Sequence, residues 1–371
     1  MNAFSRVAAA VALTCLLPLS HAADKWVVGQ SAPLTGSNGE FGTATRDGAN
    51  AWFAALNAKG GVAGRQIELL TLDDKNSRKT AGENTKTLLQ NANLVALFGY
   101  GSATLSLDSL PQAEAAGVAF VAPFSGAEPV RKNTPSLFTI RASYGEEMEK
   151  MLNFWTSLGL KRVSVVHYDD EVGKQNLDVV AAYLKKAGLV PQGLSLKRNA
   201  PVGKAEAQAL IAQQPEVILN TVLSGAAAQI QKEMVAAGRL VPTSSLSFVG
   251  ADQFIAAAGP ASAGVSISQV VPNTRSPMPA VRECAKALEA AGIKEPMNST
   301  HLEACFGARV VAEAIRRARK PVSAQTVRDA LANLGTLDLG GYQITFTPGA
   351  HHGSKYVELA MVTRDGKLTG R

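Results

Sequence analysis

The sequence predicts an α/β protein made of two lobes of similar plan. Strand-like and helix-like patterns alternate along the chain, which is typical of βαβ units around a mostly parallel sheet. The predicted strands are more than a single sheet usually contains, and 371 residues is a length that is usually divided between two domains. A hydrophobic content of 46% with 18% charged residues excludes a chain that is disordered throughout.

Residues 1–22 have the pattern of a secretory signal peptide. Arg6 supplies the positive start, and residues 7–19 are almost entirely apolar. Ser20 and Ala22 are small residues in the places that a cleavage site requires. The apolar run is shorter than the roughly 20 residues that span a bilayer, so an uncleaved anchor is the lesser alternative. We expect a periplasmic protein that loses residues 1–22.

The first half should open with a strand at 26–33 and a helix at 43–58, whose apolar residues recur on one face. Gly60 and Gly61 end that helix, because glycine readily adopts the left-handed conformation of a helix terminus. The following elements continue the alternation: strand 67–72, helix 78–91, strand 94–98, helix 103–116, strand 118–121 and strand 137–140. The chain is then expected to cross to the second lobe near residue 141.

The second half restarts the same rhythm. The expected helices are 145–158, 173–187, 204–213, 225–237 and 252–258. The expected strands are 163–166 and those near 189–196, 216–221, 246–249 and 264–271. Helices at 279–290, 300–317 and 323–333 then follow one another before strands near 343–347 and 355–362. A late segment that returns to the first lobe would explain this run of helices.

Cys284 and Cys305 sit at the same level if helices 279–290 and 300–317 form an antiparallel hairpin. An oxidising compartment favours one bridge between two cysteines. The directions of their side chains cannot be read from the sequence, so a disulfide and two buried free thiols both stay open.

Four motifs carry a family resemblance. The longest is NAKGGVAGRQIELLTLDD at 57–74, and the others are APLTG at 32–36, PFSGA at 123–127 and RASY at 141–144. Together they resemble the branched-chain-amino-acid-type, leucine-binding-protein-like periplasmic binding proteins, which are the substrate-binding receptors of ABC importers. The resemblance covers nearly all of the chain after the signal peptide.

This resemblance implies a type I periplasmic binding protein fold: two Rossmann-like lobes joined by three crossover hinge segments, with a ligand in the cleft between them. It implies that lobe 1 comprises 23–141 plus 275–343, and that lobe 2 comprises 142–274 plus 344–371. It also implies a receptor that is not an enzyme, needs no cofactor, binds a small-molecule ligand and delivers it to an ABC permease in the inner membrane.

The loop 99–104 follows a strand and opens a helix, so its N–H groups and hydroxyls favour an anion. The resemblance assigns Ser102 and Thr104 to the ligand carboxylate, and ordinary helix capping is the alternative. Ser125 and Gly126 follow another strand and form a second contact group, for which a plain turn is the alternative.

Asp252, after the strand near 246–249, is expected to pair with a ligand ammonium, and helix capping is an equal alternative. The remaining candidate contacts are Tyr144 at the crossing together with Phe41, Tyr100, Phe124 and Leu223.

Three positions depart from the family pattern. Val172 stands before Gly173 where the family commonly has a tyrosine. Leu223 stands after the strand near 216–221, where the family has another aromatic residue. Phe41 stands where a tyrosine is frequent. A pocket with fewer phenolic walls could be wider and more apolar. An aromatic acid, another small carboxylate or an amide is therefore as admissible as leucine, isoleucine or valine.

Other classes of function fit less well. An enzyme lacks support, because His351 and His352 come without matching metal-ligand spacing and no nucleophile elbow or P-loop is present. The net charge of +7 invites nucleic-acid binding, but the densest basic cluster, 316–320, ends a helix and has no interleaved aromatic residues. A ligand-sensing domain for a membrane signalling partner stays as the alternative, because its fold and pocket would be the same.

Overall fold

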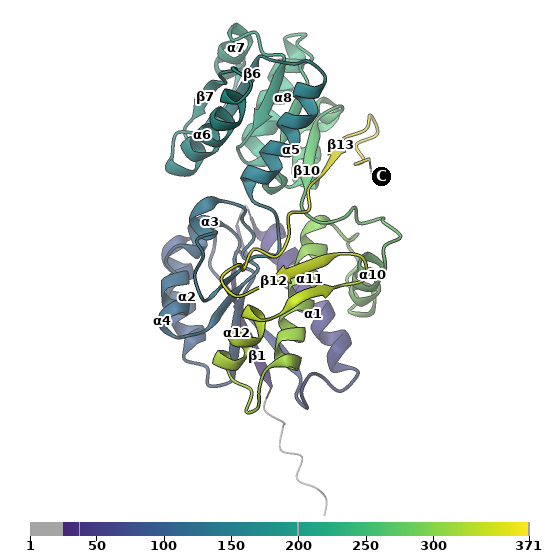
Figure 1. Ribbon diagram of the computed structural model, residues 1–371. Coiled ribbons are helices and arrows are strands. Elements are labelled where there is room, and N and C mark those ends of the chain that lie inside the picture. The colour runs from purple at the N-terminus through teal and green to yellow at the C-terminus, as the bar shows by residue number, and fades with distance from the viewer. Residues whose placement is uncertain (1–24, 37, 199, 370–371) are drawn as a thin grey trace, which may run out of the picture.

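The computed structural model describes residues 25–36, 38–198 and 200–369. The predicted signal peptide at 1–22 lies outside the described residues. The chain forms two lobes, each with its own central sheet, and Figure 1 shows the N-terminal lobe below the other. No helix within the described residues is both long and apolar enough to cross a membrane.

Lobe 1 is built on a five-stranded parallel sheet in the order β2-β1-β3-β4-β5. Its strands are β1 (Trp26–Ala32), β2 (Ile67–Asp73), β3 (Leu94–Phe98), β4 (Ala119–Val121) and β5 (Leu137–Phe138). The helices that alternate with them are α1 (Gly39–Asn57), α2 (Arg78–Leu89), α3 (Ala103–Ser106), α4 (Leu110–Ala115) and the 3-10 turn η1 (Glu128–Val130). β1 and β3 are buried along their whole length, as strands of a parallel sheet are when both faces are covered.

The helix predicted at 103–116 is divided into α3 and α4. Pro111 lies in the first turn of α4, where its missing N–H leaves no hydrogen bond unmade. Within one continuous helix the same proline would remove a ladder hydrogen bond and clash with the preceding turn. The break leaves α3 as a single turn directly after the loop 99–102.

Lobe 2 is built on a six-stranded sheet in the order β13-β10-β9-β8-β6-β7, parallel except for β13. Its strands are β6 (Val163–Tyr168), β7 (Gln192–Leu196), β8 (Val217–Asn220), β9 (Thr243–Ser245), β10 (Ser266–Gln269) and β13 (Glu358–Met361). Its helices are α5 (Tyr144–Ser157), α6 (Glu171–Lys185), α7 (Lys204–Ala212), α8 (Ser224–Ala236) and α9 (Ala251–Ala258), with the 3-10 turns η2 (Ser247–Val249) and η3 (Gly259–Ser262).

The strand predicted near 246–249 is wrong in its position, because β9 occupies 243–245 and η2 follows it. Leu246 and Val249 are buried, which explains the apolar signal. The backbone N–H of Ser247 donates to the Glu147 carboxylate at 2.8 Å instead of to a neighbouring strand. A side chain from α5 therefore ends this strand early.

The chain returns to lobe 1 through α10 (Pro279–Ala290), α11 (Ser299–Arg317) and α12 (Ala324–Ala332). α11 lies directly on β3, because a Cβ at Gly307 would come within 2.7 Å of the Phe98 ring. Cys284 of α10 and Cys305 of α11 form a disulfide, with their Cα atoms 6.1 Å apart. The two helices are thus joined covalently on the face that covers the lobe 1 sheet.

The boundary predicted after residue 343 falls inside a strand of lobe 1. β12 (Gln343–Phe346) pairs with β11 (Gly335–Asp338), and the Phe346 ring packs on Phe138 of β5. His352, still further along, lies 2.9 Å from the Thr139 hydroxyl. The hairpin packs on the lobe 1 core, so within the described tail only β13 and the residues after it belong to lobe 2.

The three crossovers expected from the resemblance are present. The chain passes between the lobes from β5 to α5, from β10 to α10 and from β12 to β13. In Figure 1 the yellow segment before β13 rises beside the blue segment that leads into α5. The fold is that of a type I periplasmic binding protein.

Candidate ligand-binding site

Two phenylalanine rings meet at the carboxyl ends of the lobe 1 strands. Phe41 of α1 and Phe124, which follows β4, pack edge to face with their ring centroids 5.6 Å apart. Gly101 lies against them, because a Cβ there would come within 3.3 Å of the Phe41 ring and 3.2 Å of Pro33. Phe41 is partly exposed. Of these two predicted wall residues, only Phe41 is thus accessible beside the loop 99–102, and Phe124 is buried against it.

Ser102 and Thr104 follow this surface at the start of α3. The Ser102 Oγ accepts the Leu105 N–H at 3.2 Å, so Ser102 does cap the helix. Capping uses a lone pair and leaves the hydroxyl proton free to donate. Thr104 is exposed. Since α3 has only four residues, any anion site here depends on hydroxyls and free N–H groups rather than on a helix dipole.

Tyr100 is not a wall residue, contrary to the prediction. Its side chain is fully buried, its ring packs on Phe120 at 4.6 Å, and its hydroxyl lies 2.8 Å from Thr85 Oγ1. Burial raises the pKa of Tyr100, so the hydroxyl stays protonated. A large ring gains most by leaving water, and this one does so in the lobe 1 core with its polar tip satisfied.

Ser125 and Gly126 meet Tyr144 across the first crossover. The two hydroxyl oxygens of Ser125 and Tyr144 are 3.3 Å apart, and the Tyr144 N–H donates to the Gly126 carbonyl oxygen at 2.9 Å. A Cβ at Gly126 would lie 2.7 Å from the Tyr144 ring. Gly126 is therefore needed for the close approach of Tyr144. The structure thus brings together Ser125, Gly126 and Tyr144, which were all predicted as ligand contacts.

The lobe 2 side of this contact contains an aromatic residue that was not predicted. The Phe248 ring of η2 lies 5.1 Å from the Tyr144 ring.

Leu223, at the N-terminus of α8, is 38% exposed, and its N–H donates to the Tyr168 hydroxyl at 3.1 Å. Tyr168 ends β6, so a phenol does stand at this end of the sheet, four residues ahead of Val172.

Asp252 lies in the first turn of α9 and does not cap it, because Gly250 is the N-cap residue. It is exposed to solvent on one side, and the surrounding protein raises its pKa by desolvation. His301 of α11 acts in the opposite direction on the pKa of Asp252. Asp252 of lobe 2 is therefore close enough to His301 of lobe 1 for each charge to influence the pKa of the other.

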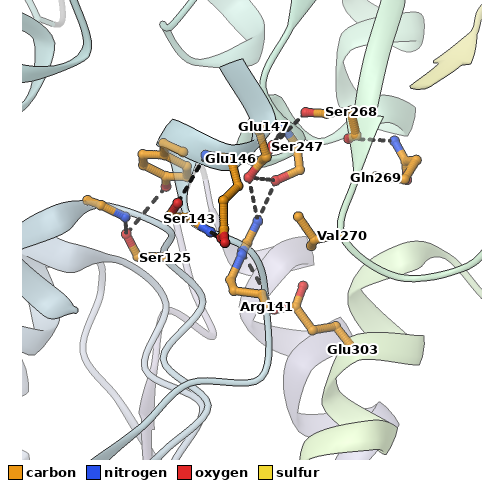
Figure 2. A network of polar contacts seen from close by, with 12 residues as sticks. Ser125, Arg141, Ser143, Glu146, Glu147, Ser247, Ser268, Gln269, Val270 and Glu303 are labelled. Carbon is orange, nitrogen blue, oxygen red and sulfur yellow. Dashed lines mark hydrogen bonds and ion pairs between the residues drawn. The ribbon is translucent and has the colours of Figure 1, made fainter. Parts of the chain in front are cut away.

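A buried charged network crosses the junction between the lobes, as Figure 2 shows. Arg141, on the first crossover, points its guanidinium at Glu147 of α5 and at Glu303 of α11, with N–O distances of 3.8 Å and 3.6 Å. It also donates to the Ser247 hydroxyl. These side chains are each less than a tenth exposed, apart from Ser247. One guanidinium thus contacts a carboxylate from each lobe.

Glu147 is the most completely satisfied member of this network. Its carboxylate accepts the N–H and the hydroxyl of Ser247 at 2.8 Å and 2.9 Å, and the Ser268 hydroxyl at 2.5 Å. α5 begins with a capping box in which Ser143 and Glu146 exchange hydrogen bonds, and this sets the position of the helix.

Tyr342, just before β12, contacts all three crossovers. Its hydroxyl oxygen lies 3.3 Å from the Ile140 carbonyl oxygen, 2.9 Å from that of Val270 and 3.0 Å from Ser354 Oγ. Burial raises its pKa, so it keeps the proton that the two carbonyl oxygens share. One hydroxyl therefore holds together three segments that are far apart in the sequence.

The sequence predictions missed Phe248, Glu147, Glu303 and Tyr342. Arg141 stood in a quoted motif, but no partner was named for it. For Glu303, its place between the apolar residues Leu302 and Ala304 is the one available signal, because buried charges need partners. The interlobe partners, such as Arg141 and Glu303, are more than a hundred residues apart, and local patterns do not connect them.

Comparison with known proteins agrees with this architecture. A family model described as periplasmic binding protein matches residues 25–367. A substrate-binding periplasmic protein from Ralstonia solanacearum has a TM-score of 0.86 at 31% identity, and the match covers 93% of this chain and 99% of that one. A possible leucine/isoleucine/valine-binding protein from Rhodopirellula baltica SH 1 has a TM-score of 0.88 at 23% identity, covering 94% and 97%.

A characterised relative is similar to this chain in amino-acid sequence. An amino acid binding protein from Pseudomonas aeruginosa is 26% identical over 183 residues, which are 48% of this chain and 49% of that protein. The chain therefore spans about half the length of the curated relatives it matches. With the family model covering nearly the whole described chain, the protein belongs to the periplasmic binding proteins, a family of substrate-binding proteins rather than enzymes.

Proposed function

We propose that the protein is the periplasmic receptor of an ABC importer, and that it binds a small carboxylate-bearing ligand between its lobes. The family match across residues 25–367 carries this proposal. The relatives named as amino acid binding and leucine/isoleucine/valine-binding proteins support a small amino acid or a related compound. The ligand would be passed unchanged to a permease in the inner membrane.

Lobe 1 would bind the ligand first. The proton of the Ser102 hydroxyl is free, Thr104 is exposed, and Gly101, next to Ser102 in the chain, lies against the Phe41 ring. Hydroxyl donors to a carboxylate are charge-assisted and stronger than neutral pairs. The apolar part of the ligand would pack on Phe41, where apolar surface is removed from water.

Lobe 2 would then complete the site by a hinge motion at the three crossovers. Asp252, whose pKa is influenced by His301 of lobe 1, would pair with an ammonium group, while Leu223 and Phe248 would cover the apolar part. Closure excludes water, which strengthens polar contacts and favours the ligand of the right length. The closed form would be the one that the permease recognises, so the ligand acts by shifting a population.

The test is a thermal-shift screen of the purified protein, followed by calorimetry. The panel should contain aliphatic and aromatic amino acids, their deamino analogues, short amides and dicarboxylates. A ligand well above its dissociation constant stabilises the protein by about 3 kcal/mol, which is seen as a higher melting temperature. Stabilisation by none of the carboxylates, or conversion of a bound compound into a product, would overturn the proposal.

A further inference from the structure

The junction between the lobes holds one more acid than base. Arg141 stands between Glu147 and Glu303, and all three side chains are almost completely buried. The neighbouring Arg131 already has Glu146 at 3.8 Å. A buried carboxylate without a full partner is costly, so the second carboxylate at Arg141 calls for a physical explanation.

The two carboxylates at Arg141 are satisfied to very different degrees. Glu147 accepts three hydrogen bonds from Ser247 and Ser268, all within lobe 2. Glu303 has Arg141 as its one polar partner within the described residues, at 3.6 Å. This distance is an ion pair but too long for a hydrogen bond. The loose contact is therefore the one that reaches lobe 1.

Arg141 itself belongs to both lobes. Its carbonyl oxygen accepts a hydrogen bond from Arg131 of lobe 1 at 2.9 Å, while its guanidinium is held by Ser247 and Glu147 of lobe 2. Its Nε has no hydrogen-bond partner among the residues that the structure describes. The guanidinium thus keeps one spare donor beside an under-satisfied carboxylate.

A second pair of groups lies on the same side of the junction. Asp252 of lobe 2 and His301 of lobe 1 each influence the pKa of the other, and His301 stands on the first turn of α11, two residues before Glu303. A movement that brings lobe 2 toward the start of α11 therefore shortens the Asp252–His301 and Arg141–Glu303 separations together.

We propose that the Arg141–Glu303 ion pair is an interlobe latch, which tightens as the lobes close and so makes Glu303 a positioning residue for ligand binding. The proposal rests on the proposed receptor function for its effect on affinity, but its effect on the interlobe distance does not require a ligand. Glu303 would contribute no contact to the ligand, and it would act through the position of lobe 2.

The latch should respond to pH. Burial raises the pKa of Glu303, nearby Glu147 also raises it, and Arg141 lowers it. The titratable groups near the start of α11 include His301 on the helix itself, Asp252 from α9, Asp47 from α1, Glu295 before the helix and Tyr342 before β12, and Arg309 further along the helix pairs with Glu283. A tighter pair with Arg141 lowers the pKa of Glu303 on closure, so closure releases a proton. Closure is then favoured as pH rises through the interval between the open and closed pKa values.

The decisive experiment measures the distance between the lobes in the full-length protein. Spin labels at Lys86→Cys of α2 and Lys174→Cys of α6 sit on exposed positions of the two lobes. Pulsed dipolar spectroscopy then gives the distance distribution for the labelled parent and for its Glu303→Gln variant, across about pH 4 to 8. Glu313→Gln is the matched control, because Glu313 is on the same helix but pairs with Arg316 and Arg317.

The expected result is a shift toward longer distances in Glu303→Gln, no shift in Glu313→Gln, and a pH response of the parent that Glu303→Gln loses. Identical distributions for the parent and Glu303→Gln would overturn the latch, whatever ligand the protein binds. Any pH response that survives in Glu303→Gln belongs to Asp252 or His301 and counts against Glu303.

A second arm uses calorimetry with the ligand that the thermal-shift screen finds. Glu303→Gln should bind on the order of tenfold more weakly, and proton release on binding should be lost. Equal affinity and equal proton release in the parent and the variant would contradict the latch. Failure of the screen to find a ligand would count against the receptor function alone, because the distance measurement still decides the latch.

Discussion

The strand-end face of lobe 1 and the junction between the lobes both carry polar side chains, but the hydrogen-bonding capacity of these side chains is used to different degrees. On the face, Ser102 keeps a free hydroxyl proton and Thr104 is exposed. At the junction, Glu147 accepts three hydrogen bonds and the Tyr342 hydroxyl has three partners. Polar groups with spare capacity suit recognition, and satisfied ones suit architecture.

This difference predicts opposite consequences of substitution. A change on the lobe 1 face should alter ligand affinity more than stability, whereas a change at the junction should alter stability more than the contacts of the ligand. Each of the following substitutions sharpens this contrast or breaks it, and they are arranged from the largest expected effect to the smallest.

Glu147→Ala should have the largest effect on folding. It leaves the Arg141 guanidinium buried beside fewer partners and removes the acceptor for Ser247 and Ser268. Breaking a buried pair by removing one partner costs about 3 to 5 kcal/mol, here in the free energy of unfolding. Denaturant titration measures it, with Glu149→Ala on the exposed side of the same helix as the control. A loss no larger than that of the control would refute the assigned role.

Removal of the hydroxyls of Ser102 and Thr104 should weaken ligand binding by about 3 kcal/mol, because hydrogen bonds to a charged group are worth 1.5 to 3 kcal/mol each. Ser102→Ala also removes the cap of α3, at a stability cost of about 1 kcal/mol. Ser102→Gly keeps most of the capping and loses the hydroxyl. It should therefore bind the ligand as weakly as Ser102→Ala does, but it should unfold at a higher denaturant concentration. Unchanged affinity by calorimetry would remove the carboxylate assignment.

Tyr342→Phe should lower the free energy of unfolding by about 1 to 2 kcal/mol, since it leaves two buried carbonyl oxygens and Ser354 without their shared partner. Tyr356→Phe is the control, because that hydroxyl bonds Glu358 two residues away and joins no crossovers. Thermal unfolding compares the two variants. Equal losses would mean that joining the crossovers contributes nothing of its own.

Asp252→Asn should have the smallest and most selective effect, about 1 kcal/mol for a partly exposed pair. Amino acids should bind more weakly while their deamino analogues do not change. Because desolvation raises the pKa of Asp252, its charge is lost at a higher pH than that of a free aspartate. Affinity for amino acids should therefore fall as pH falls through that raised value, and Asp252→Asn should lose this part of the pH dependence. An equal fall for both classes of ligand would contradict the ammonium role.

Most of the fold could be predicted from the sequence, because strand and helix patterns are local. The alternation before residue 141 and the run of three helices both correspond to elements of the structure. The errors arise where a side chain that is distant in the sequence determines the local secondary structure. Residues 247–249 form a 3-10 turn in place of the predicted strand, because the Glu147 carboxylate of α5 accepts the N–H of Ser247. Likewise, the return of β12 to lobe 1 depends on its pairing with β11, which carries no strong pattern.

The candidate site could be predicted only in part. The loop 99–104 and the run at 123–127 stand at strand ends, and the structure brings Phe41, Phe124 and Gly101 together there. Tyr100 was misplaced because the sequence does not say which way a residue in a loop points. The Arg141 network was missed because its members come from four separate segments.

The packing of α11 on β3 also bears on the order in which the protein can acquire its structure during synthesis. The sheet of lobe 1 is complete in sequence by Phe138, yet Gly307 and its neighbours must arrive before the Phe98 ring is covered. The strands of lobe 2 from β6 to β10, by contrast, follow one another without interruption. A chain that is synthesised with its N-terminus first would therefore keep its earliest lobe unfinished until most of its length has been made. Contacts so distant in sequence form slowly, so the lobe that is begun first is not the first lobe that can be completed.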